Sequence, residues 1–241
     1  MWGPIGVPAL DQVMASLSGL GIGSRSRVLD LGCGPAELLR RLSENLGASG
    51  LGVDTSRFAL AEARRRVSGS PAHGRVELRL GDVHELDRRH DFDLVICIGP
   101  GWDTGGWTVL TEWAAGFAAP GALVLLGEGA WRTPPSRQML ERLEMGADDY
   151  LPTAEVEDAI RGGTVEPIWV HRASSDEWRT YETSYRGALD RFARQHLGDP
   201  IAPAAAERAG RGWARFELMH SVLDFVLVLG RRGPESNVIA G

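Results

Sequence analysis

Short apolar runs alternate with helical periodicity over the first two thirds of the chain, and this alternation limits the fold more than any other feature. Strand-like runs occupy residues 27–31, 50–54, 76–80, 92–98 and 121–126. Between them, apolar residues recur three and four positions apart, as they do along one face of a helix. Strands that alternate with helices are typical of a parallel sheet covered by helices. The sequence therefore predicts an α/β fold.

The pattern changes after residue 130. A mixed helical stretch (134–150) and two amphipathic helices (174–197 and 203–219) are predicted around a candidate strand at 164–170. The chain then ends on a strongly apolar strand, Val222–Leu229. Two late strands separated by helices predict an antiparallel hairpin at the sheet edge, with the helices folded as a cap.

The length suits one α/β domain with ample residues for a core. We expect a single domain over residues 1–231, in which 132–150 and 172–220 form the cap. A flexible tail is expected at 232–241.

The first strand ends in an acid and a glycine-rich turn, Asp30-Leu31-Gly32-Cys33-Gly34. Such glycines let the backbone turn tightly against a ligand before a helix begins. A dinucleotide-binding fold needs Gly-x-Gly-x-x-Gly, but the third glycine position holds Glu37, whose charge would repel a pyrophosphate at the helix N-terminus. The pattern fits better a strand-end acid followed by Gly-x-Gly, for a ligand without phosphates.

Three further landmarks follow in order. Asp54 ends the second strand, 20 residues after Gly34, at the spacing of a βαβ unit. An acid-apolar pair, Asp82-Val83, follows the third strand, and Pro120-Gly121 precedes the fifth. Together these features resemble the class I S-adenosylmethionine-dependent methyltransferases, over most of the chain. The resemblance implies a Rossmann-like sheet of seven strands whose last hairpin is antiparallel, and S-adenosylmethionine as the cofactor, with S-adenosylhomocysteine as its product.

The resemblance also implies a cofactor site along the strand ends, formed by Asp30, Gly32, Cys33, Gly34, Asp54, Thr55, Asp82, Val83 and Gly99. In this family the first acid and the glycines hold the amino acid part of the cofactor. The second acid, here Asp54, accepts hydrogen bonds from both ribose hydroxyls, a task that suits a carboxylate. The third acid frames the adenine. The chain departs from the family at Ala36, where a third glycine is frequent.

More distant segments are similar to a poorly characterised bacterial branch of the family that is associated with small molecules. They are residues 101–106, 127–132 and 178–182, with a Trp213-containing helix before the last strand. An acceptor that is aromatic or apolar is therefore expected, with transfer to oxygen, nitrogen or carbon left open.

Aromatic side chains near the strand ends and on the long helix are the candidates for binding the acceptor: Trp102, Trp131 and Tyr185. Aromatic faces can pack an apolar substrate or attract a sulfonium. The alternative for the tryptophans is that they anchor the core or a loop. The tyrosines at positions 181 and 185 share a helical face, where they can also simply pack the cap.

Three residues are candidates for catalysis: Glu128, Tyr181 and His220. Methyl transfer is an in-line displacement, and positioning alone can lower its barrier by up to ~7–11 kcal/mol. A base is needed only if the acceptor carries its proton at working pH. Glu128 can act as a base or be a surface carboxylate, and His220 can be an ordinary helix-end histidine.

Composition excludes several mechanisms. All 26 basic residues are arginine, against 32 acidic residues and a net charge of −6. Without lysine the chain has no Walker-type phosphate loop and no Schiff-base or pyridoxal chemistry. An acidic chain is also a poor general binder of nucleic acid.

Other partners are predicted from what the sequence lacks. Its two cysteines, Cys33 and Cys97, have no metal spacing, and no metal is expected. No apolar run is long enough to span a membrane, and no secretory signal precedes the domain. We expect a cytoplasmic monomer or homodimer that binds neither membrane nor nucleic acid.

Two alternatives to a small-molecule methyltransferase stay open. One is an enzyme that methylates RNA, DNA or protein, although residues 98–102 lack the motifs common in base-modifying members. The other is a non-catalytic module that binds the cofactor, which the intact set of strand-end acids and glycines disfavours.

Overall fold

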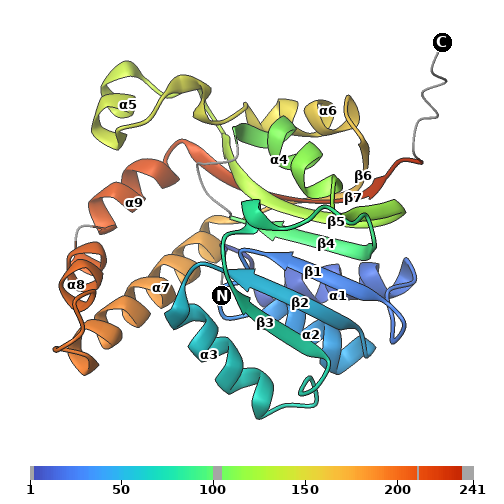
Figure 1. Cartoon of the computed structure of the whole chain (residues 1–241). Coiled ribbons are helices and arrows are strands. Elements are labelled where there is room, and N and C mark those ends of the chain that lie inside the picture. The colour runs from blue at the N-terminus through green and yellow to red at the C-terminus, as the bar shows by residue number, and fades with distance from the viewer. Residues whose placement is uncertain (1–2, 100–104, 211, 235–241) are drawn as a thin grey trace.

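The computed structural model describes residues 3–99, 105–210 and 212–234. One seven-stranded sheet has the order β3-β2-β1-β4-β5-β7-β6 (Figure 1). All neighbours are parallel except β7, which runs antiparallel to both β5 and β6. The strands are β1 (Arg27–Leu31), β2 (Ser49–Asp54), β3 (Val76–Leu80), β4 (Phe92–Ile98), β5 (Ala118–Trp131), β6 (Val165–Arg172) and β7 (Leu223–Arg232).

Helices cover both faces of the sheet, so the predicted α/β fold with a late antiparallel hairpin is confirmed. The chain runs outward from β1 to β3 and returns to β4 on the other side of β1, which places a switch point between β1 and β4. The helices are α1 (Val7–Gly19), α2 (Glu37–Leu46), α3 (Arg57–Ser68), α4 (Gly106–Ala115), α5 (Arg137–Leu143), α6 (Val156–Arg161), α7 (Ser175–Gln195), α8 (Ala202–Gly210) and α9 (Gly212–His220).

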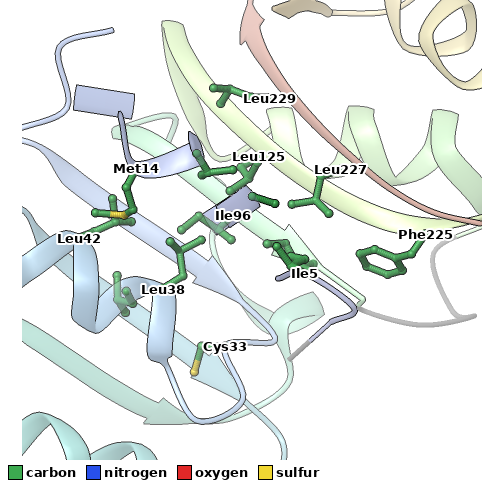
Figure 2. Close-up of a cluster of buried hydrophobic side chains, with 14 of the residues drawn as sticks. Ile5, Met14, Cys33, Leu38, Leu42, Ile96, Leu125, Phe225, Leu227 and Leu229 are labelled. Atoms are coloured by element: carbon green, nitrogen blue, oxygen red, sulfur yellow. The ribbon is translucent and has the colours of Figure 1, made fainter. Parts of the chain in front are cut away.

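Side chains of alternate residues in the central strands belong to two separate hydrophobic cores, one on each face of the sheet. On one face Ile96 of β4 packs with Met14 of α1 and Leu38 of α2 (Figure 2). On the other face Val95 packs with side chains of α4 and α6, such as Trp107. A strand covered on both sides must be apolar at nearly every position, which explains the continuous apolar run of β4.

The remaining helices lie to one side of the sheet. Helix α7 leads away from the sheet to α8 and α9, and α9 packs against α5 (Figure 1). These four helices face the carboxyl ends of the parallel strands, where the sheet itself provides no cover.

Several boundaries differ from the sequence expectation. β5 extends well beyond 121–126 because it pairs with β7 as far as Trp131, so Glu128 lies inside this strand and not after it. The predicted helix at 203–219 is two helices, α8 and α9, with glycines at positions 210 and 212 beside the break. Helix α1 was not predicted. Of the predicted tail, Arg232 still belongs to β7, and residues 235–241 lie outside the described residues.

Gly50 of β2 allows α2 to pack closely on the sheet. A Cβ atom at this position would lie 2.3 Å from the Leu39 Cδ1 and 3.1 Å from the Val28 carbonyl oxygen. We expect Gly50→Ala to lower the free energy of unfolding by about 1–3 kcal/mol, because a buried leucine must move. Denaturant titration measures the change. Gly23→Ala is the matched control, since its Cβ would meet no atom within 4 Å. Equal stability of the two variants would contradict the packing assigned to Gly50.

Candidate functional site

The turn after β1 places two glycines in the left-handed region, with φ of +71° at Gly32 and +52° at Gly34. Glycine adopts this conformation without the steric cost that other residues have. The space beside Gly32 is open, because a Cβ atom there would have no neighbour within 4 Å. The turn therefore exposes backbone at the end of β1.

Asp54, at the end of β2, holds this turn. Its carboxylate accepts a hydrogen bond from the Gly34 amide at 2.7 Å through one oxygen and from the Ser56 amide at 2.7 Å through the other. The amides of Gly32 and Cys33 donate to the Val53 carbonyl at 2.9 and 3.0 Å. One carboxylate thus connects the glycine turn, the second strand and the start of α3.

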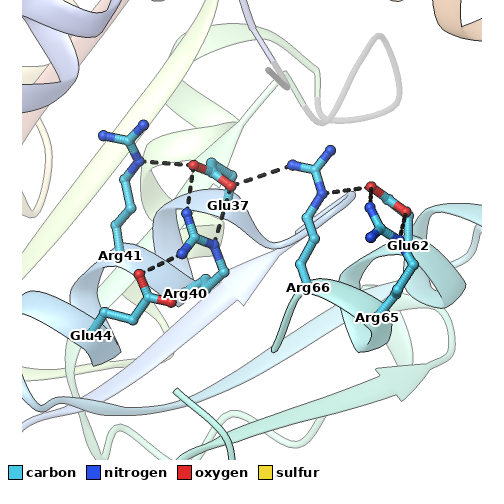
Figure 3. A network of polar contacts seen from close by, with 7 residues as sticks. All are labelled: Glu37, Arg40, Arg41, Glu44, Glu62, Arg65 and Arg66. Carbon is cyan, nitrogen blue, oxygen red and sulfur yellow. Dashed lines mark hydrogen bonds and ion pairs between the residues drawn. The ribbon is translucent and has the colours of Figure 1, made fainter. Parts of the chain in front are cut away.

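Glu37, in the first turn of α2, is tied to the neighbouring helix by arginines (Figure 3). It accepts hydrogen bonds from Arg40 and Arg41 at 2.9 Å and from Arg66 of α3 at 3.3 Å. Burial raises the pKa of Glu37, but the bonds from Arg40 and Arg41 outweigh it and hold that pKa at about 2. Glu37, whose charge disfavours a dinucleotide site, is thus part of an ion-pair network that joins α2 to α3.

Asp30 lies in β1 beside the turn and is only 4% exposed. Burial, together with the nearby charge of Asp54, raises the pKa of Asp30 to about 7. Cys33 is buried next to it, and burial likewise raises the pKa of its thiol, with Asp30 and Asp54 adding to the effect. The thiol is therefore protonated at neutral pH, and Asp30 is the group that titrates there.

The ends of β3 and β4 complete this edge. The Gly81 amide donates to the Asp54 carbonyl at 3.1 Å, and the Asp82 carboxylate accepts from the His84 amide at 2.9 Å. The Gly99 amide donates to the Gly127 carbonyl at 2.7 Å. We call this edge the strand-end site. It contains every predicted cofactor residue: Asp30, Gly32, Cys33, Gly34, Asp54, Thr55, Asp82, Val83 and Gly99.

A cavity of about 1170 Å³ lies between β5 and the four helices beside the sheet. Glu128 forms part of its wall from β5, and Tyr181 and Tyr185 from α7. The two tyrosine rings stack with centroids 5.9 Å apart. Burial, with Tyr185 and Glu182 nearby, raises the pKa of Tyr181 to about 12, so its phenol is neutral. The structure thus brings three predicted residues to one cavity.

Glu128 is 7% exposed, and its carboxylate accepts a hydrogen bond from the Gly129 amide at 2.7 Å. The ring of Tyr150 covers Gly129, where a Cβ atom would lie 2.7 Å from the Tyr150 Cε1. Burial and the charge of Glu128 raise the pKa of the Tyr150 phenol. The sequence did not single out Tyr150, because no local pattern links it to a strand 20 residues earlier.

Three other predicted residues have different surroundings. Trp131 is 4% exposed, and its indole donates to the Ala147 carbonyl at 2.8 Å, so it anchors a loop. His220 packs on Trp178 and Phe216. Burial and the charges of Arg132 and Arg179 hold the pKa of His220 below its usual value. Within the described residues, neither Trp131 nor His220 lines the cavity. Trp102 lies outside the described residues.

No group of three or more His, Cys, Asp or Glu side chains in the described ranges is placed to hold a metal ion. None of the helices in these ranges has both the length and the apolar character that crossing a membrane requires.

Comparison with known proteins gives similarities of sequence and of fold. Residues 28–115, which run from β1 into α4, match the family model described as a methyltransferase domain. A protein of Escherichia coli (strain K12) named YjhP and described as uncharacterized is 26% identical over 179 residues, 73% of this chain and 72% of that protein. A trans-aconitate 2-methyltransferase of Streptomyces avermitilis is 26% identical over 161 residues, 64% of this chain and 60% of that enzyme.

A solved structure is similar over nearly the whole chain. It is a SAM-dependent methyltransferase from Thiobacillus denitrificans in complex with S-adenosyl-L-homocysteine. The TM-score is 0.82 at 23% identity, and the match covers 96% of this chain and 94% of that one. The two proteins share their fold.

The raised pKa of Asp30 predicts a stability effect in the ligand-free protein. Between the unfolded value of 3.8 and about 7, the native state binds more protons than the unfolded chain, so stability falls as pH rises through this range. Asp30→Asn removes the buried charge. We expect it to raise the free energy of unfolding at pH 8 by about 1–4 kcal/mol, and by much less at pH 5.

Denaturant titration at the two pH values measures this difference. Asp87→Asn is the control, because the side chain of Asp87 is 84% exposed and no burial penalty is removed. An Asp30→Asn variant whose advantage is the same at pH 5 and pH 8 would show that Asp30 is not the titrating group.

Proposed function

We propose that this chain is a class I S-adenosylmethionine-dependent methyltransferase that transfers a methyl group to a small organic acceptor, a proposal supported by the match to a methyltransferase domain and by the shared fold. When bound, S-adenosylmethionine supplies an electrophilic methyl group on a sulfonium. The acceptor atom is an oxygen, nitrogen or carbon of a molecule with an aromatic or apolar part. Transfer proceeds by in-line displacement, mainly through positioning of the acceptor.

The strand-end site fits the cofactor. Both oxygens of Asp54 already accept amide hydrogen bonds, and each keeps a further lone pair for a ribose hydroxyl. The open space at Gly32 admits the amino acid part beside the carboxylate of Asp30. Asp82 and Val83 are assigned to the adenine. Asp54 is the observation that carries the proposal, because it joins the glycine turn to the ribose position.

The cavity is assigned to the acceptor, and the helices around it (α5, α7, α8 and α9) to a cap within a single domain. Glu128 is the first candidate for orienting the acceptor or accepting its proton, since it is buried and forms part of the cavity wall. Tyr181 is the second, as a neutral phenol. His220 is retained as the third, although it packs on Trp178 and Phe216 and does not line the cavity. Tyr185 contributes an aromatic surface for the acceptor, and Trp131 supports Tyr150.

The location and assembly of the enzyme are also proposals. Both cysteines of the chain are free and buried, which agrees with a reducing, cytoplasmic setting. A monomer or homodimer without a metal is expected, as is the absence of stable binding to RNA. Tight, salt-dependent RNA binding would instead favour the nucleic-acid alternative.

Cofactor binding is the first test. Calorimetric titration of the wild-type protein with S-adenosylmethionine is expected to give one site per chain. Asp54→Asn is expected to weaken this binding by about 10- to 100-fold, because the ribose hydroxyls lose a charged acceptor. Asp87→Asn, an exposed carboxylate outside the site, is the matched control. Wild-type protein that binds no S-adenosylmethionine, or Asp54→Asn protein that binds it normally, would contradict the proposal.

Catalysis is the second test. Labelled S-adenosylmethionine is mixed with a panel of amines, phenols and carboxylic acids to find an acceptor. With that acceptor, Glu128→Gln is expected to lower kcat by about 100- to 10,000-fold without changing cofactor affinity, because the variant has no base. Glu141→Gln on α5, with a side chain 63% exposed, is the control. An unchanged kcat would show that positioning alone drives the transfer.

A further inference from the structure

Three arginines on three different helices surround the cavity. Arg142 belongs to α5, Arg208 to α8 and Arg215 to α9, and all three line it. Among the described residues, no carboxylate oxygen lies within 4.0 Å of any of these guanidinium groups. A fourth lining arginine, Arg186, differs from them, because it forms an ion pair with Glu182 at 2.7 Å. We refer to Arg142, Arg208 and Arg215 as the cavity arginines.

Six acidic residues in the described part of the chain also line the cavity: Glu128, Glu144, Asp148, Asp149, Glu182 and Glu207. Glu182 pairs with Arg186, and the carboxylate of Asp149 accepts from the Gly146 amide at 2.8 Å. Glu128 accepts from the amide of the next residue. Among the described residues, none of the six carboxylates forms an ion pair with a cavity arginine, so these guanidinium groups keep N–H donors for a ligand.

The backbone contacts of the arginines keep this arrangement in place. Arg186 donates to the carbonyls of Arg208 and Ala209 at 3.4 Å, which holds the end of α8 against α7. Arg215 donates through one nitrogen to the Leu143 carbonyl at 2.6 Å, which joins α9 to the end of α5. The other guanidinium nitrogens of Arg215 carry further N–H groups that can donate to a ligand.

One of the guanidinium groups lies against the aromatic wall, and a second acts on it electrostatically. Arg208 lies 5.8 Å from the ring centroid of Tyr185, which stacks on Tyr181. Burial raises the pKa of Tyr181 and of Tyr150, and the charges of Arg208 and Arg215, respectively, act in the opposite direction. The positive charges therefore act on the same phenols that form the cavity wall.

We propose that the methyl acceptor carries an anionic group, a carboxylate or a phosphate, which Arg208 and Arg215 bind. Guanidinium groups bind both anions through paired hydrogen bonds. Arg142 adds positive charge beside them. The planar or apolar part of the acceptor packs on Tyr181 and Tyr185, and the atom that accepts the methyl group faces Glu128. This specificity rests on the proposed function, because it assumes that the cavity holds the acceptor.

Matched pairs of probes test the charge requirement. Protein loaded with S-adenosylhomocysteine is titrated calorimetrically with 4-hydroxybenzoate against 4-hydroxybenzamide, and with phenyl phosphate against phenol. We expect at least one anion to bind tenfold or more tightly than its neutral partner, and the stronger anion identifies carboxylate or phosphate as the preferred group. Anions that bind no more tightly than their neutral partners, including no measurable binding of any probe, would overturn the inference.

A double variant, Arg208→Gln with Arg215→Gln, assigns the effect to these residues. It should lose the preference for the anion while binding S-adenosylhomocysteine as the wild type does. Arg137→Gln is the control, since Arg137 lies on α5, does not line the cavity and has a side chain 94% exposed. A double variant that keeps the preference would also overturn the inference. Failure of the wild type to bind S-adenosylhomocysteine would instead refute the proposed function.

Discussion

The carboxylate of Asp54 is the contact on which the site depends. It fixes the turn after β1 from the end of β2, through one bond to the Gly34 amide and another to the Ser56 amide. Parallel neighbouring strands bring these groups to the same edge of the sheet, and the switch point between β1 and β4 leaves that edge open. Without this carboxylate, the turn would keep only the bonds from the Gly32 and Cys33 amides to the Val53 carbonyl of the adjacent strand.

The cavity proposed for the acceptor depends on a different constraint, the long antiparallel pairing of β5 with β7. The two strands stay paired from Leu123 to Trp131, which carries Glu128 past the point where the parallel strands end. After β5 the chain continues into α5, and the cavity lies between β5 and the helices α5, α7, α8 and α9. In the proposed assignment the cofactor and the acceptor therefore use separate parts of the sheet, and α5, α7, α8 and α9 add residues to the acceptor site beside Glu128 of β5.

The strand-end site was predictable because its signals are local. The bounds of β1, β3 and β4 match the sequence expectation, and the acids and glycines follow directly at the strand ends. Ala36 shows a limit of predicting backbone conformation from residue type, since it takes the left-handed φ of +53° that usually favours glycine. Helix α1 could have been predicted from the sequence, because Ala9, Val13 and Leu17 recur at helical spacing. The extent of β5 could not have been predicted, because it depends on pairing with a strand about a hundred residues later. The cavity arginines lie on three helices, and no local sequence pattern predicts how these helices pack together.

A crystal structure of the complex with S-adenosylhomocysteine tests the central claim most directly. We expect both ribose hydroxyls within hydrogen-bond distance of the Asp54 carboxylate, with the adenine beside Asp82 and Val83 and the amino acid part beside Gly32. A nucleoside bound elsewhere, with the Asp54 carboxylate still bonded to backbone amides alone, would contradict it.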